Sequence, residues 1–572
     1  MRIANLSKMR FLIILLKLFI TLLILNEIHN FTSINKIISD RYIFNDDSRQ
    51  QISPFLFKNH IVKDDYIITY HKDVFSPLGI KILYGSLIGR KHIEFFSKII
   101  PYFLYGIFII GVYICSSFYS NKFIGFSSVI FSILLPNILV YMQGGIARSF
   151  APVFLIYGLY FLSRSNYFYL GMTTIAATLF YPVAGLICGA SLFFSVLIDY
   201  FIKGNNFSKR NINIVIAVAI LSSVILIPSL INGSKYGNRI GENEIKTYPE
   251  AGIGGRYNIH STPPYDNFYK AYFTINSDYM RDVRSMVPQL SIRNYSKYGW
   301  SKLSIIILWI AVITIPLLFF YKIYISDYHY LKIFIFTLSS ILLYQFAIIL
   351  EPFLYFPFRY LFYTVPIFSV VLVPNLIFDF IKSQFVKYRF QISNRLISII
   401  SMLIIIFCIN LVGREYPNEF KGLMQVDKNM PILNSINSTS ENAVIAGWPN
   451  GLIDNIPYLC TRKAYLHMET HQAFHSKYVL EMRKRFQSFL NAYFSDNKKD
   501  VELLREKEGV THIIINKDHF YKDSYPKYFK MYDKAISSIF NKNKDNFFLK
   551  SYIKDKIDNE SPYVLIDLWN LQ

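Results

Sequence analysis

The stretch INIVIAVAILSSVILIPSLI, from Ile212 to Ile231, decides the class of fold. It contains no charged residue. Its length matches the about 20 apolar residues that a helix needs to cross the hydrocarbon core of a bilayer. Similar apolar runs recur along the chain and are separated by polar segments. This alternation predicts an α-helical polytopic membrane protein.

The apolar runs predict about eleven membrane-spanning helices. The stretch from Phe150 to Phe201 is compatible with three spans, or with two spans and a re-entrant piece around Tyr181-Pro182. The predicted spans cover residues 10–27, 99–117, 123–141, 150–164, 167–182, 184–202, 212–231, 302–321, 331–350, 361–380 and 396–413. The first span is expected to stay uncleaved, because no small-residue cleavage site follows it.

Lysine and arginine in the short loops set the orientation. With the N-terminus inside, the inner segments hold fourteen of these cations, and the short outer loops hold only Arg148 and Arg359. An excess of Lys and Arg marks cytoplasmic loops. We therefore predict an inner N-terminus and, with eleven spans, an outer C-terminus.

This orientation predicts a transmembrane domain over 1–413 with large outer segments at 28–98 and 232–301. It also predicts an exoplasmic soluble domain over 414–572. Short apolar runs in this tail predict strands at 443–447, 511–516 and 563–567, and helices at 472–492, 499–507 and 527–540. The tail is therefore expected to be a small α/β domain.

The net charge of +22 does not indicate nucleic-acid binding, because the excess lies mainly in loops between apolar runs. The four cysteines have neither a disulfide pattern nor zinc spacing. His467, Glu469, His471 and His475 lack the HExxH pattern, so they do not indicate a metal site.

Acidic pairs stand out in the first outer segment, at Asp46-Asp47 and at Asp64-Asp65. Paired carboxylates beside a membrane can act as a general base, or can hold a divalent cation against a phosphate. The alternative is a solvated acidic loop, or a cap on a helix that starts near Ser48. Residue chemistry alone leaves both interpretations open.

Arg148 and Arg359 each lie at the start of a predicted span, in outer loops that hold few other cations. A guanidinium at a helix N-terminus can bind a phosphate through two hydrogen bonds. The alternatives are contact with lipid headgroups or, for Arg359, an ion pair with Glu351. In the second outer segment, Tyr265 and Asp266 lie in a proline-braced loop that could contact a sugar or acceptor, although the pattern favours an ordinary ordered loop.

The order of these pieces resembles the GT-C class of membrane glycosyltransferases. In that class a first span leads to an outer loop with an acidic pair, a bundle of ten or more spans follows, and an outer soluble domain ends the chain. The resemblance is narrower to a bacterial branch related to transferases that use polyprenyl-phosphate sugars. The matching pieces are Asp46-Asp-Ser-Arg-Gln50, Ala147-Arg-Ser-Phe150, Phe180-Tyr-Pro182, Pro357-Phe-Arg-Tyr360, Ala446-Gly-Trp-Pro449 and Gly509-Val-Thr-His-Ile513.

The resemblance implies transfer of a sugar from a polyprenyl-phosphate donor to a glycan, lipid or protein acceptor, on the exoplasmic face of a bacterial inner membrane. It implies that Asp46 or Asp47 deprotonates or orients the acceptor hydroxyl, and that Arg148 and Arg359 bind the donor phosphate. A divalent cation such as Mg²⁺ or Mn²⁺ is compatible with the acidic pair. The pair here is Asp-Asp rather than the Asp-Glu of the mannosyltransferase branch, so the acceptor and the metal do not carry over.

Other functions remain open at this point. A polymerase or ligase of surface polysaccharide also works outside on polyprenyl-linked glycans, but the long folded tail argues against it. A transporter is disfavoured because no repeat is visible and the apolar runs hold few charges. A non-catalytic assembly protein would use the tail as its working part.

Overall fold

A computed structural model describes residues 39, 42–44, 47–134, 138–139, 142–204, 208–241, 244–256, 328–350, 357, 359–387, 393–412, 423–425, 430–522, 524–544, 546–554 and 561–571. The predicted spans at 10–27 and 302–321 lie outside the described residues, as do Asp46, Tyr265 and Asp266.

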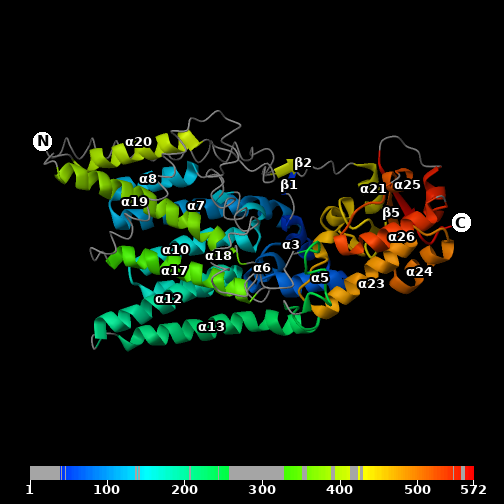
Figure 1. Ribbon diagram of the computed structural model, residues 1–572, viewed down its shortest axis with the longest axis horizontal. Coiled ribbons are helices and arrows are strands. Elements are labelled where there is room, and N and C mark those ends of the chain that lie inside the picture. Colours follow the sequence, from blue (N-terminus) through cyan, green and yellow to red (C-terminus); the bar gives the residue numbers. More distant parts are fainter. Residues whose placement is uncertain are drawn as a thin grey trace.

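A helical bundle forms one end of the molecule, and its helices run side by side along the long axis (Figure 1). α11 packs against α10, α12 and α13, while α7 packs against α8, α10 and α19. The bundle is built from α7 (Ile93–Tyr119), α8 (Lys122–Leu134), α10 (Ala151–Ser163), α11 (Tyr167–Phe180), α12 (Pro182–Lys203), α13 (Lys209–Ser234), α17 (Tyr328–Ile349), α18 (Arg359–Phe362), α19 (Thr364–Lys387) and α20 (Asn394–Val412).

Among the described residues, five stretches of helix are long and apolar enough to cross a membrane: Arg90–Tyr119, Pro182–Ile202, Lys209–Ser234, His329–Ala347 and Arg359–Lys387. The described helices at 122–133, 147–163, 167–180 and 394–404 are apolar but shorter. The membrane character is therefore supported by length and composition, whereas the total of about eleven spans stays a prediction.

Three helices occupy the stretch from Phe150 to Phe201, where the sequence left two arrangements open. α11 ends at Phe180, Tyr181 is extended, and α12 begins at Pro182. Proline fits the first turn of a helix because the backbone N–H that it lacks would have no partner there. The Phe-Tyr-Pro piece is thus a sharp break between two helices.

Residues 47–92 fold into short helices at the end of the bundle nearest the tail (Figure 1). A strand, β1 (Tyr42–Phe44), precedes them and pairs antiparallel with β2 (Leu423–Gln425), which follows the last bundle helix. The short helices are α3 (Asp47–Leu56), α4 (Asn59–Asp64), α5 (Tyr66–Tyr70), η1 (His71–Phe75), α6 (Leu78–Ile82), η2 (Leu83–Leu87) and η3 (Arg90–His92).

The tail contains a four-stranded sheet in the order β4-β3-β5-β6. β3 (Val444–Gly447) is parallel to both β4 (Lys463–Ala464) and β5 (His512–Asn516), and β6 (Tyr563–Asp567) is antiparallel to β5. Ile513 and Ile515 face one buried cluster and Ile514 faces another, as the alternation of side chains along a strand requires. The predicted strands at 443–447, 511–516 and 563–567 are confirmed.

Helices flank both faces of this sheet. α21 (Pro431–Asn437) packs on one side, while α23 (Ser476–Tyr493), α24 (Lys498–Glu508) and α26 (Asp533–Asn543) pack on the other. The remaining turns are η11 (Leu452–Asn455), α22 (Ile456–Leu459), η12 (Met468–Thr470), α25 (Asp518–Tyr521), η13 (Lys530–Tyr532), η14 (Phe548–Lys550) and α27 (Ser551–Lys554).

The helix that the sequence predicts from Lys527 begins only at Asp533, so its predicted start is wrong. The indole N–H of Trp448 and the side-chain amide of Asn450 both donate to the carbonyl of Lys527, at 3.3 and 3.4 Å. Lys527 therefore lies in a loop whose carbonyl is bound by side chains that follow β3.

Aromatic side chains join the tail to the outer segments. Tyr70 of α5 stacks on Tyr478 of α23 with ring centroids 3.6 Å apart, and its hydroxyl lies 3.0 Å from Nδ1 of His475. Tyr236, just after α13, packs edge-on to Tyr70 at 4.7 Å. Such pairs add to the stabilisation that burial of their area provides. Tyr70 and Tyr236 thereby belong to the same buried cluster as Tyr478 and the core of the tail.

The predicted orientation has a direct test. A reporter that is active only outside the cytoplasm should be active when fused after Gly413 and inactive when fused near Lys387. The reason is that the fourteen Lys and Arg residues of the predicted inner segments favour the cytoplasmic side, and the tail is predicted to lie on the other side. A cytoplasmic reporter should give the reverse pattern. Activity of the cytoplasmic reporter after Gly413 would overturn the orientation.

Candidate functional site

Helix α3 begins at Asp47, and its second residue, Ser48, lies against a glycine that precedes α10. Gly144 has φ of 83°, and a Cβ at this position would lie 2.3 Å from the Oγ of Ser48. Only glycine combines this left-handed backbone with so close an approach. The contact fixes the backbone at the start of α3 beside the segment that leads to Arg148.

That segment consists of two short turns, η4 (Gln143–Gly145) and η5 (Ala147–Phe150). The hydroxyl of Tyr84, a buried residue of η2, donates to the carbonyl of Gly145 at 2.7 Å. The hydroxyl of Ser149 donates to the carbonyl of Gln143 at 3.1 Å. Arg148 therefore projects from a braced turn, and its side chain is half-buried.

Aromatic contacts link the turn that carries Arg148 to the α11–α12 break, and that break to the residue after α18. Phe150 stacks on Phe180 at 4.4 Å, so η5 contacts the break between α11 and α12. At that break Tyr181 packs edge-on to Tyr363 at 5.6 Å, directly after α18. Arg359 is the first residue of α18 and is half-buried.

The tail also contacts this end of the bundle. α22 packs against α3, and Tyr458 of α22 belongs to the bundle's buried cluster. Burial raises the pKa of Tyr458 well above its ordinary value, with Glu94 and Tyr84 adding to the effect and Arg49 opposing it. The tail helix α22 thus lies against α3, which begins at Asp47 and packs against η4, the turn that leads to Arg148.

The second acidic pair is placed elsewhere. Asp65 is buried and caps α5, where its Oδ1 accepts a hydrogen bond from the backbone N–H of Ile68 at 2.8 Å. Burial raises the pKa of Asp65, while this hydrogen bond and the charges of Arg485 and Lys463 oppose the rise. Asp64 ends α4 and is exposed. The structure gives Asp65 a capping role at the junction with the tail.

Sequence reasoning missed Gly144, Tyr84 and Tyr458, which hold the site segments in place. The paired glycines of Gln143-Gly-Gly145 were the available signal, because neighbouring glycines mark a backbone that departs from a helix. Tyr458 has no comparable local signal, since its role depends on packing between the tail and the bundle.

Solved structures of an oligosaccharyltransferase from Archaeoglobus fulgidus are similar to this chain. The apo form is 10% identical and aligns over 88% of this chain and 69% of that chain, with a TM-score of 0.46. A complex with an inhibitory peptide and a dolichol-phosphate is 10% identical, over 87% and 69%, with a TM-score of 0.46. A complex with Zn and sulfate is 11% identical, over 92% and 70%, with a TM-score of 0.47.

These likenesses are too distant to assign a family or an activity. No protein-family model matches the chain, and no curated protein matches its sequence.

Within the described residues, no three His, Cys, Asp or Glu side chains gather so that they could hold a metal ion. His467 pairs with Asp454 at 3.1 Å, and Glu469 pairs with Arg256. The hydroxyl of Tyr528 lies 2.8 Å from Nδ1 of His471. Each of these side chains is engaged in the packing of the tail.

Two buried histidines predict how stability depends on pH. Burial lowers the pKa of His71 to about 3, and His467 and Arg256 add to this shift. Burial also lowers the pKa of His471 to about 4, with Glu250 opposing the shift and Arg256 adding to it. A histidine with a folded pKa below its unfolded value of about 6.5 stabilises the fold above pH 6.5, and this stability is lost as the pH falls towards the folded value. We expect each histidine to lower the unfolding free energy by about 1.4 kcal/mol per pH unit over that window.

Thermal unfolding of the detergent-solubilised chain between pH 7.5 and 4.5 measures this slope. His71→Phe should make the slope shallower, because phenylalanine binds no proton. The substitution breaks no hydrogen bond, since neither ring nitrogen of His71 has a hydrogen-bond partner within the described structure. Exposed His60 provides the matched control, His60→Phe. An unchanged slope for His71→Phe would contradict the assignment.

Proposed function

We propose that this chain is a membrane glycosyltransferase that moves a sugar from a polyprenyl-phosphate donor to an acceptor hydroxyl on the exoplasmic face. The observation that supports the proposal is the packing of α3 against η4 at one end of an apolar bundle, where aromatic contacts also link η5 to the α11–α12 break and that break to Tyr363 after α18. These segments hold Asp47 at the start of α3, Arg148 in η5 and Arg359 at the start of α18.

The chemistry requires a base, a grip on the leaving group and a membrane to hold the donor. The carboxylate of Asp47, or of Asp46, takes the proton of the acceptor hydroxyl as that oxygen attacks the anomeric carbon of the donor sugar. The bond from this carbon to the phosphate oxygen breaks, and polyprenyl phosphate leaves with the electron pair. Arg148 and Arg359 stabilise the negative charge that develops on the phosphate.

The bundle suits a donor with a long lipid tail. α13 is a 26-residue helix, and its most apolar stretch is largely open to its surroundings in the described structure. An exposed apolar surface of this kind is stable only in lipid. A polyprenyl chain in the same lipid can bring its phosphate to the bundle end where the two arginines lie.

A divalent cation remains compatible with this site. The carboxylates of Asp46 and Asp47 are the ligands that Mg²⁺ or Mn²⁺ would take, and the ion would neutralise the donor phosphate. The proton transfer and bond cleavage described above do not require such an ion. Transfer measured with EDTA, and again after either metal is restored, tests its participation.

Replacing Arg359 with Lys tests the phosphate grip. Lysine keeps the charge but loses the planar fork that binds phosphate through two hydrogen bonds. We expect the KM for the polyprenyl-phosphate donor to rise about tenfold, with a smaller change in kcat. The assay is sugar transfer in membranes at matched protein levels. Arg395→Lys, at an exposed residue of α20, is the control, and an unchanged KM for Arg359→Lys would remove Arg359 from the site.

A second candidate function is transport, and one observation favours it. Lys332 of α17 and Asp199 of α12 form a fully buried ion pair, with Nζ and Oδ1 2.9 Å apart. Buried ionisable residues between spans often mark an ion pathway. This pair lies near the helix ends rather than at their middle, and a tyrosine and a serine share its hydrogen bonds. A structural role fits this position better than a conduction path.

A further inference from the structure

The tail contains a pocket that is separate from the site at the bundle end. Its volume is about 260 Å³, and it opens where β3 and β5 end. Ligands commonly bind at the carboxyl ends of parallel strands, because the loops that follow neighbouring strands diverge there. Trp448 follows β3 directly, and Asn516 is the last residue of β5.

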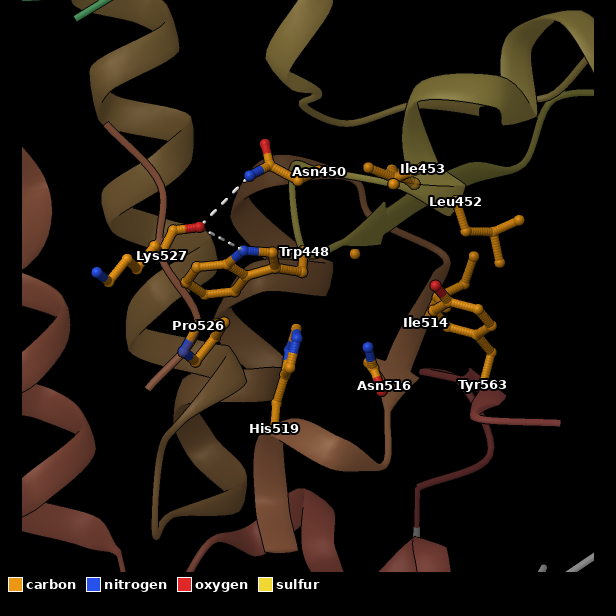
Figure 2. Close-up of a pocket in the computed structure, with 12 residues that line it drawn as sticks. Trp448, Asn450, Leu452, Ile453, Ile514, Asn516, His519, Pro526, Lys527 and Tyr563 are labelled. Atoms are coloured by element: carbon orange, nitrogen blue, oxygen red, sulfur yellow. Dashed lines mark hydrogen bonds between the residues drawn. The ribbon is translucent and has the colours of Figure 1, made fainter. Parts of the chain in front are cut away.

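Rings and amides surround this pocket. Figure 2 shows Trp448 and Tyr563 on opposite sides, with His519 and Asn516 below the space between them and Asn450 above Trp448. Among the twelve described residues that line the pocket, Lys527 is the only Lys, Arg, Asp or Glu. The pocket therefore offers flat apolar faces together with neutral hydrogen-bonding groups.

The indole of Trp448 is held rigidly. Four aromatic rings surround it with centroids 5.8 to 6.3 Å away, and its N–H donates to the Lys527 carbonyl. The ring of His519 lies edge-on to it at 5.4 Å, and the Nδ1 of His519 lies 3.1 Å from the hydroxyl of Tyr493. Because these rings are already ordered, a ligand loses little free energy in fixing them.

The pocket's shape favours a single ring over an extended peptide. Pockets for drug-sized ligands measure about 300–1,000 Å³, so this one takes a smaller unit. Peptides often add as a strand to an open sheet edge. β3 lies between β4 and β5, and β5 lies between β3 and β6, so these two strands of the lining already have partners on both sides. β6, the edge strand, contributes only its first residue, Tyr563, to the lining.

The lining matches a sugar ring in particular. A pyranose has an apolar C–H face that packs on an aromatic ring, and hydroxyls around its edge that bond to amides and phenols. A phosphorylated ligand would need more positive charge than one lysine supplies. We propose that this pocket binds one sugar unit of a glycan, and that this glycan is the acceptor of the transfer reaction. The second part of this statement rests on the proposed function.

The test measures binding and transfer separately, on the full-length chain in detergent. Saturation-transfer NMR is recorded with the methyl glycosides of glucose, galactose, N-acetylglucosamine and glucuronic acid, with short oligosaccharides of each, and with a set of six-residue polar peptides. The pocket variant combines Asn450→Ala with Tyr563→Phe, which removes two polar groups and leaves Trp448 in place. The matched control combines Asn546→Ala with Tyr521→Phe, at exposed residues outside the lining.

We expect at least one sugar to bind the parental chain, about tenfold weaker binding in the pocket variant, and unchanged binding in the control. Sugars that bind both variants equally, or peptides that bind in a pocket-dependent way where no sugar does, would overturn the proposal. Asp47→Asn separates the two proposals. If it and the parental chain both lack transfer while pocket-dependent sugar binding persists, the proposed function fails and the sugar site stands.

Discussion

Replacing Asp47 with Asn is expected to lower the rate of sugar transfer by about 10²–10⁴-fold, the usual contribution of a general base. Asparagine keeps the size of the side chain but cannot accept the acceptor's proton. The KM for the donor should change little, because the arginines rather than the carboxylate hold the phosphate. The measurement is transfer from a polyprenyl-phosphate sugar in membranes, with protein level controlled.

Asp46→Asn is made in parallel, since either carboxylate of the pair can carry the role. Asp496→Asn, at an exposed residue of the tail, is the control for a general loss of acidic charge. If the Asp46 and Asp47 variants both transfer sugar at the parental rate, the pair serves only the start of α3. That result would favour the transport and assembly interpretations.

Replacing Lys332 with Met is expected to lower the unfolding free energy by about 3–5 kcal/mol, because it leaves the Asp199 carboxylate buried without its cation. Lys332 Nζ also donates to Ser195 and Tyr167, at 2.6 and 3.0 Å, and the Tyr167 hydroxyl donates to Asp199 at 2.5 Å. The network joins α11, α12 and α17. Thermal unfolding in detergent measures the loss.

The double variant Asp199→Asn with Lys332→Met should recover much of this stability, since neither buried charge remains. Lys382→Met, at an exposed residue of α19, should change stability by less than about 1 kcal/mol. A single variant Lys332→Met that is as stable as the parent would show that the pair contributes nothing to holding the bundle together.

The sequence predicted those parts of the fold that depend on local pattern. Apolar runs located the described helices of the bundle, and the apolar stretches around Ile445 and Ile514 located inner strands of the tail sheet. The ends were less accurate where side chains far away in the sequence decide them. Lys527 stays in a loop because Trp448 and Asn450 bond to its carbonyl.

The candidate site was predictable as a set of residues but not as an arrangement. Acidic pairs and outer arginines can be read from the sequence, whereas their neighbourhood depends on contacts between distant segments. Ser48 against Gly144 and Tyr181 against Tyr363 are such contacts. The capping role of Asp65 was also hidden, because it depends on α5 beginning at Tyr66.

The pairing of β1 with β2 bears on how the protein is made. β1 lies directly before the acidic pair, and its partner ends at Gln425, after the last helix of the bundle. A chain that emerges from the ribosome in order cannot form this pairing until nearly all of its membrane segments have been synthesised. We expect β1 to remain unpaired throughout insertion, while the contact of Ser48 with Gly144 can form earlier. A fragment that is released before β2 is made would therefore lack this pairing beside the acidic pair.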